Sequence, residues 1–130
     1  MNRVLIAGLS LLAIASSPAL ADGDAAAGEK VFRKCKACHT VGEDAKNKVG
    51  PLLNEIIGRQ AGMVDDFKYS PAMADAGTGG LVWDEASLDA FLTKPKEFMS
   101  GTKMTFPGLR KEEDRADVIA YLMTFSPAAE

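Results

Sequence analysis

Five consecutive residues bring two thiols and an imidazole together, in the run Cys35-Lys36-Ala37-Cys38-His39. Cys-x-x-Cys-His is the attachment pattern of a c-type haem. Each thiol can add across one vinyl group of the porphyrin, because the two-residue spacing spans the edge of the ring. His39 would then lie under the iron, where a neutral imidazole is a strong axial ligand. The chain contains 1 histidine, so a second histidine ligand is excluded.

Three other uses of a Cys-x-x-Cys pair are less consistent with the sequence. A thioredoxin-type redox pair needs a βαβ pattern, whereas the flanks here are helical and lysine-rich. A structural zinc site needs four ligands, and the chain offers 2 cysteines and 1 histidine. A structural disulfide stays an alternative, because an exported protein allows it. The adjacent histidine and an export signal together favour haem attachment.

Residues 1–21 have the pattern of a secretory signal peptide. Arg3 supplies a positive start, residues 4–15 are apolar, and Ala19-Leu20-Ala21 is a small-residue cleavage site. The apolar run is short for a membrane span, so we expect cleavage after Ala21, with an uncleaved anchor as the alternative. Residues 22–130 would then be one periplasmic domain.

Capping residues and apolar spacing predict an all-α fold without strands. Asp22 and Asp24 can both cap the first helix, Ser70 is a good N-cap for another, and Leu88, Phe91 and Leu92 form one apolar stripe. The chain offers few, short helices and hence a modest core, which a covalently held porphyrin would complete. The expected helices cover residues 22–34, Ser70 to about Asp75, Asp84 to Pro95, and Glu112 to Phe125.

The second axial ligand can be a methionine, a lysine or nothing. We expect Met123 to pack on the last helix, and Met63, beside Asp65 and Asp66, to be either solvated or gap-filling. Met99 and Met104 lie in a loop rich in Gly and Pro, and spacing alone leaves both open. A His/Met pair raises the reduction potential and leaves no open site, which suits electron transfer.

Further short motifs follow the haem motif in a specific order and spacing. Together they resemble the class I c-type cytochromes, and most closely the bacterial cytochrome c2 group related to mitochondrial cytochrome c. The motifs are Gly28-x-x-x-Phe32, Gly50-Pro51, Gly58-Arg59, Tyr69-Ser70, Trp83, Gly101-Thr102-Lys103-Met104 with Phe106 and Gly108, and the run from Arg115 to Leu122.

The resemblance implies a small class I cytochrome c fold, with N- and C-terminal helices crossing and one covalent haem c. It implies that Met104, not Met99, is the second axial ligand. It also implies that the Pro51 carbonyl accepts a hydrogen bond from the other nitrogen of His39. Gly28 and Phe32 would pack against Val118 and Tyr121.

The same resemblance assigns Tyr69, Trp83 and Arg59 to the haem propionates, with a plain core aromatic as the alternative for Trp83. The chain departs from the mitochondrial pattern at several positions. Phe91 replaces a tyrosine near the methionine sulfur and lacks the hydroxyl that would donate a hydrogen bond to the ligand. The others are Met73 for an asparagine, Ser100 for a proline, and a longer loop at residues 77–80.

Charge is unevenly distributed along the chain. Removal of Arg3 with the signal leaves 14 of the 15 basic residues against 18 acidic ones, or −4. The absence of a basic run in an exported acidic chain argues against nucleic-acid binding. Either the surface is a solvated mixture of positive and negative side chains, or a positive face around the haem edge steers acidic redox partners to the protein. We expect the protein to be a monomer. That face would carry Lys34, Lys48, Lys96, Lys103 and Lys111, with Lys36 and Arg110 nearby.

These features predict a periplasmic one-electron carrier, not an enzyme. Its partners would be a membrane quinol-oxidising complex as donor and a terminal oxidase or photosynthetic reaction centre as acceptor. The alternative is a peroxidase-like enzyme or gas sensor in which a labile Met104 opens an iron site, and Phe91 makes this alternative more plausible.

Without haem, we expect the protein to be largely unfolded. A Cys35→Ala, Cys38→Ala double variant cannot attach the porphyrin covalently, so its core would stay incomplete. Its far-ultraviolet circular dichroism should show little helix and no cooperative thermal transition. A cooperative transition in that haem-free variant would contradict this expectation.

Overall fold

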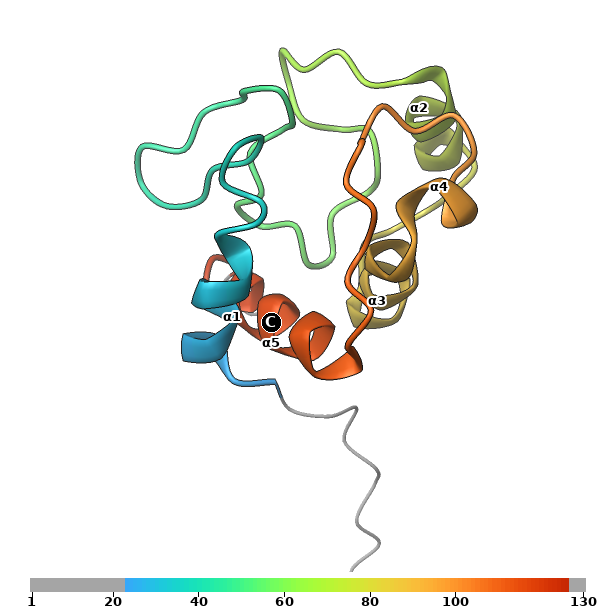
Figure 1. Ribbon diagram of the computed structural model, residues 1–130. Coiled ribbons are helices and arrows are strands. Elements are labelled where there is room, and N and C mark those ends of the chain that lie inside the picture. Colours follow the sequence, from blue (N-terminus) through green and yellow to red (C-terminus); the bar gives the residue numbers. More distant parts are fainter. Residues whose placement is uncertain (1–22, 127–130) are drawn as a thin grey trace, which may run out of the picture.

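Five helices and long irregular segments make up residues 23–126, which the computed structural model describes (Figure 1). Within that range, extended segments pair only at one isolated bridge, Gln60 with Val82. The all-α fold class is therefore confirmed. The expected signal peptide lies outside the described residues, and no helix within them has the length and apolarity to cross a membrane. The helices are α1 (Ala25–Phe32), α2 (Pro71–Thr78), α3 (Glu85–Thr93), α4 (Pro95–Phe98) and α5 (Glu112–Met123).

The start of α1 is fixed onto α5, beside which it lies in Figure 1. The Asp24 carboxylate accepts hydrogen bonds from the backbone N–H groups of Ala26 (2.8 Å) and Ala27 (3.2 Å), as an N-cap does. The backbone N–H of Asp24 in turn donates to Oδ1 of the buried Asp117 at 2.8 Å. One cap thus orders the helix start and also joins two elements far apart in the sequence.

A glycine allows α1 and α5 to approach closely. A Cβ atom at Gly28 would lie 1.9 Å from the carbonyl oxygen of Asp117 and 2.8 Å from the Cβ of Tyr121. One turn later, the buried ring of Phe32 packs against Tyr121 with 5.4 Å between ring centroids. The contacts of Gly28 and Phe32 with Tyr121 agree with those that the resemblance implied.

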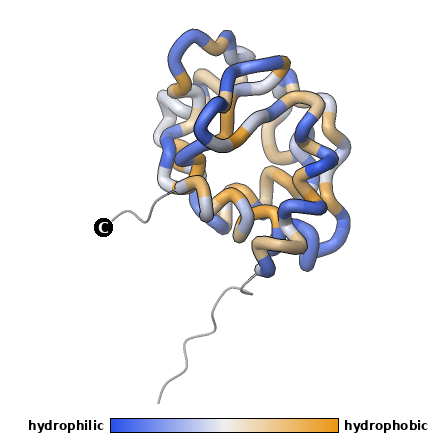
Figure 2. The backbone as a smooth tube through the Cα atoms, turned by 90° about the vertical axis from the view of Figure 1, so that its left-hand side faces the viewer, coloured by the Kyte–Doolittle hydropathy of each residue, from blue (hydrophilic) through white to orange (hydrophobic). Residues whose placement is uncertain are grey.

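The helix α3 also packs its apolar face toward the interior, as α1 and α5 do. Asp84 and Ser87 form a reciprocal capping box at its start. The predicted stripe of Leu88, Phe91 and Leu92 is buried. The core also includes Val118, Ile119 and Leu122 of α5. Hydrophobic stretches of backbone gather where α1 and α5 lie, at the bottom of Figure 2, while several outer loops are hydrophilic.

The structure corrects the expected end of α2. This helix continues to Thr78 instead of stopping near Asp75. The side-chain amide of Gln60 donates to the Gly77 carbonyl oxygen at 2.7 Å. The backbone N–H of Leu81 donates to the Ala76 carbonyl oxygen at 2.9 Å. These bonds satisfy carbonyl groups at the end of the helix, so the glycines that follow Asp75 do not end it earlier.

Three further expectations differ from the structure. The regular helix α1 ends at Phe32, and hydrogen-bonded turns replace it up to Cys38. The short helix α4 was not expected, because its four residues are too few to show a periodicity. Met123 was expected to pack, but 42% of its surface is exposed, because α5 turns this position away from the core.

We predict that Gly28→Ala lowers the free energy of unfolding by more than about 2 kcal/mol, since the added methyl group must force α1 away from α5. Denaturant unfolding of the haem-loaded protein measures this. Gly79→Ala is the matched control: its Cβ would come no closer than 3.2 Å, to the Asp75 carbonyl oxygen. Equal losses in the two variants would contradict a tight helix crossing.

Candidate functional site

A cavity of about 460 Å³ lies at the centre of the structure, and all eight site residues expected from the sequence line it. This volume is within the usual range for small-molecule and cofactor sites. Most other lining residues are apolar, including Phe32, Leu88, Phe91, Val118 and Leu122. The eight predicted residues are Cys35, Cys38, His39, Pro51, Arg59, Tyr69, Trp83 and Met104.

The two cysteines and the histidine leave the end of α1 in a tight turn. The N–H of Cys35 donates to the Phe32 carbonyl at 2.8 Å, and that of His39 donates to the Cys35 carbonyl at 2.9 Å. Both thiols are free and half-buried. The turn presents both sulfurs and the imidazole to one cavity.

The thiol of Cys35 is held in its neutral form. Burial raises the pKa of Cys35 to about 11, and the neighbouring Cys38 adds to this, while Lys34 opposes it. At neutral pH the Cys35 sulfur therefore keeps its proton within the apolar lining. This is the form that reacts with a vinyl group, because its sulfur bonds to one vinyl carbon and its hydrogen to the other.

His39 is held in one orientation and one tautomer. Its Nδ1 lies 2.7 Å from the carbonyl oxygen of Pro51, the hydrogen bond that the resemblance implied. Because a carbonyl can only accept, Nδ1 must carry the proton, which leaves the Nε2 lone pair free. Burial lowers the pKa of His39, and the nearby Arg59 lowers it further, although the bond to Pro51 opposes both. A neutral imidazole with a free Nε2 is suited to bind a metal.

Two methionines within the described residues line the cavity, Met104 and Met73. Met104 belongs to an extended segment, residues 102–107, which forms one wall. Met99 is 6% exposed and packs in the apolar core without lining the cavity. Met63 is 59% exposed, as expected for a solvated side chain. The structure thus separates the two methionines that spacing left open.

The three residues assigned to the propionates place polar groups on the lining. The Arg59 guanidinium donates to the carbonyl oxygens of Leu52 (3.2 Å) and Asn54 (3.1 Å), and burial lowers its pKa. The Tyr69 hydroxyl accepts from the N–H of Val64 at 3.0 Å, so its own proton is free to be donated.

Trp83 supplies a further polar group. Its ring is 5% exposed, and its indole N–H has no hydrogen-bond partner within residues 23–126. No buried, unpaired side-chain nitrogen or oxygen occurs in that range, so this N–H remains accessible from the cavity. A donor left open on an apolar wall fits a cofactor with acidic groups.

The lysines expected at the haem edge have different surroundings. Lys34 and Lys103 line the cavity, and Lys96 lines a smaller neighbouring groove together with Phe106. The ammonium group of Lys48 donates to the Lys36 carbonyl at 3.1 Å, and Lys111 is exposed at the start of α5.

Sequence reasoning missed part of the lining. Val49, Phe67 and Thr105 belong to irregular segments with no periodicity to mark their inward side. The position of Phe67 had one weak signal, because it lies two residues before the Tyr69-Ser70 motif. The ammonium of Lys103 donates to the Lys68 carbonyl at 2.6 Å and lies 6.0 Å from the ring centre of Phe67.

The cavity and its donors fit a haem. The interior is apolar like a porphyrin face, and two thiols lie on it with the sequence spacing of a c-type haem attachment motif. The same lining offers an imidazole nitrogen and a thioether sulfur, the axial pair of many electron-transfer haems. Arg59, Tyr69 and Trp83 add hydrogen-bond donors for acidic substituents.

Comparison with known proteins agrees with this fit. The family model described as cytochrome c matches residues 25–126. A cytochrome c2 of Afifella marina is 55% identical over 100 residues, covering 77% of this chain and 81% of that protein. A cytochrome c2 of Rhodomicrobium vannielii is 48% identical over 124 residues, covering 95% of this chain and 97% of that one.

A solved structure extends the similarity to three dimensions. Cytochrome c2 from Rhodospirillum centenum aligns with a TM-score of 0.77 at 45% identity, covering 81% of this chain and all of that chain. The residues matched by the family model, 25–126, include both cysteines and the histidine. The chain therefore belongs to the cytochrome c family, as a cytochrome c2-like class I electron carrier with one covalently attached haem c.

Proposed function

We propose that the protein is a periplasmic one-electron carrier, not an enzyme, with His39 and Met104 as the axial ligands of its haem iron. One observation carries the ligand assignment. Met104 lines the same cavity as the oriented imidazole of His39, on a separate segment of the chain, whereas Met99 lies outside the lining. With both axial positions taken by protein side chains, no position is left for a substrate.

The haem supplies the one-electron chemistry, because its iron is stable in both the ferric and the ferrous state. The protein residues determine which state is favoured. The apolar lining disfavours added positive charge, and the thioether of Met104 favours the ferrous state. The hydrogen bond from His39 to Pro51 keeps the imidazole in one place during the redox cycle, so little reorganisation is required.

We propose that the partners are membrane redox complexes: a quinol-oxidising complex as donor, and a terminal oxidase or photosynthetic reaction centre as acceptor. Lys34 and Lys103 support this proposal, since they contribute positive charge directly to the cavity wall. Lys96 adds charge beside the neighbouring groove. A periplasmic location follows from the expected signal peptide and cleavage after Ala21, and a monomer is the form we propose for docking.

Replacing Met104 tests the ligand assignment. We predict that Met104→Leu abolishes the weak red band of the oxidised protein that reports a methionine–iron bond, and allows the ferrous protein to bind carbon monoxide. Met73→Leu is the matched control, because Met73 lines the same cavity on α2, and it should retain the band.

Two results would contradict the assignment. Loss of the band in Met73→Leu or Met99→Leu alone would identify a different ligand. Ready binding of carbon monoxide by the unaltered ferrous protein would favour the alternative, in which a labile Met104 opens the iron of a peroxidase-like enzyme or a gas sensor.

Association with an isolated quinol-oxidising complex should slow as salt is added. Raising the ionic strength from about 0.01 M to about 0.15 M shortens the screening length from about 30 Å to about 8 Å. We predict a fall of about tenfold in the association rate constant, measured by stopped-flow reduction. Lys96→Gln should lower the rate at low salt, and Lys30→Gln, an exposed change on α1 outside both grooves, should not. A salt-independent rate would exclude electrostatic steering.

A further inference from the structure

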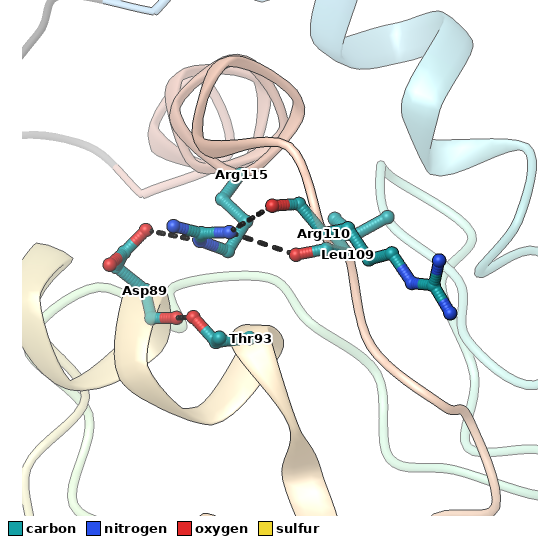
Figure 3. Close-up of polar contacts among 5 residues, drawn as sticks. All are labelled: Asp89, Thr93, Leu109, Arg110 and Arg115. Atoms are coloured by element: carbon teal, nitrogen blue, oxygen red, sulfur yellow. Dashed lines mark hydrogen bonds and ion pairs between the residues drawn. The ribbon is translucent and has the colours of Figure 1, made fainter.

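One guanidinium joins three parts of the structure (Figure 3). Arg115, near the start of α5, donates from Nε to Oδ1 of Asp89 on α3 at 2.7 Å. Its Nη1 also donates to the carbonyl oxygens of Leu109 (2.9 Å) and Arg110 (3.1 Å). The side chain of Arg115 is 11% exposed and that of Asp89 is 44% exposed. The arginine is thus largely enclosed by the groups that it binds.

The two carbonyl groups end the segment that carries Met104, and this end is also fixed to α3. The N–H of Leu109 donates to the Leu92 carbonyl at 2.8 Å. Gly108 adopts a φ of +112°, and a Cβ atom there would lie 2.2 Å from the carbonyl oxygen of Thr93. The backbone at residues 108–110 therefore lies directly against the C-terminal end of α3.

Between these fixed points the segment has little structure of its own. The described structure contains no hydrogen bond between main-chain groups in which residues 103–108 take part. Toward its N-terminal side, the segment is held by the bond from the Lys103 ammonium to the Lys68 carbonyl, 2.6 Å long. Within the segment, the N–H of Met104 donates to Oγ1 of Thr102 at 3.3 Å, and the side chains of Met104 and Phe106 pack against the core. The rest of the main chain of the segment is held by the contacts at its two ends.

We propose that Arg115 and Asp89 are positioning residues, which keep the Met104 sulfur on the iron by fixing the C-terminal end of its segment. This inference rests on the proposed role of Met104. Asp89 orients the guanidinium, and the planar fork then holds two adjacent carbonyls, which a lysine ammonium cannot reproduce with the same geometry. We call the bonds of Arg115 to Asp89 and to the two carbonyls the clamp. Loosening the clamp should increase the fraction of molecules in which Met104 has left the iron.

The affinity of an added ligand measures that fraction. Imidazole can bind the ferric iron only when the methionine has moved away, so its apparent affinity is proportional to the population of the open form. A change that only weakens packing between α3 and α5 would lower global stability without raising this affinity in the folded protein. The titration therefore separates a positioning role from a purely structural one.

The experiment uses haem-loaded ferric protein, titrated with imidazole while the red methionine–iron band is recorded. We expect Arg115→Met to bind imidazole about tenfold more tightly than the unaltered protein, equal to about 1.4 kcal/mol in the opening equilibrium. Asp89→Asn should give a smaller gain, of about threefold, because the two carbonyl bonds remain. The double variant should exceed Arg115→Met by little, since both residues act through one clamp.

Asp75→Asn is the matched control: the same chemical change on an exposed helical site, α2, that forms no ion pair within the described residues. It should leave the imidazole affinity unchanged. Should Arg115→Met not accumulate, Asp89→Asn and Arg115→Lys still provide the test, since each removes only part of the clamp.

Two negative outcomes have different meanings. If the unaltered protein shows the red band and Met104→Leu removes it, but imidazole affinity is the same in the Arg115 and Asp89 variants, this inference alone is overturned. If the unaltered protein has no such band, the proposed ligand is wrong, and the positioning role is overturned with it.

Discussion

The walls of one apolar cavity connect nearly every segment of this protein. Side chains from α1, α2, α3 and α5 and from three irregular segments meet across about 460 Å³ of space that none of them fills. Protein interiors are packed as densely as organic crystals, so such walls need a partner of matching size and apolarity. A covalent haem is therefore a part of the core, and the short helices are sufficient because they do not have to form a core alone.

The two axial ligands that we propose, His39 and Met104, belong to parts of the cavity wall that are built in different ways. The histidine side is local: the turn from Cys35 to His39 and the carbonyl of Pro51 lie within 17 residues of one another. The methionine side depends on distant contacts, because the segment of Met104 is held by Lys68 at one end and by Arg115 at the other. Local structure survives small disturbances of packing, whereas a segment held at its ends responds to any change in its anchors. Ligand exchange should therefore begin on the methionine side.

The sequence predicts features that have a local signature. The Cys-x-x-Cys-His motif, the caps at Asp24 and Ser70, and the apolar stripe of α3 were recognised because spacing alone expresses their physics. The extension of α2 to Thr78 depends on a hydrogen bond from Gln60, seventeen residues away from Gly77, so no local pattern reveals it. The Asp89–Arg115 pair is separated by 26 residues and was missed for the same reason. The choice between Met99 and Met104 likewise had to come from the resemblance, since both lie in one loop of similar composition.

Two departures from the mitochondrial pattern, Phe91 and Met73, make the position of Met104 more dependent on the clamp formed by Arg115 and Asp89. Phe91 and Met73 both line the cavity, and neither carries a hydroxyl or amide that could donate to a methionine sulfur. Where the resemblance expects a tyrosine hydroxyl, the structure provides an apolar ring that is 6% exposed. With Met104 as the proposed ligand, a thioether that lacks such a donor depends more strongly on its packing and on its own backbone for its position. The backbone contacts of the segment therefore matter more in this protein, and Arg115 holds its C-terminal end through bonds to two successive carbonyls, as Lys103 holds the other end.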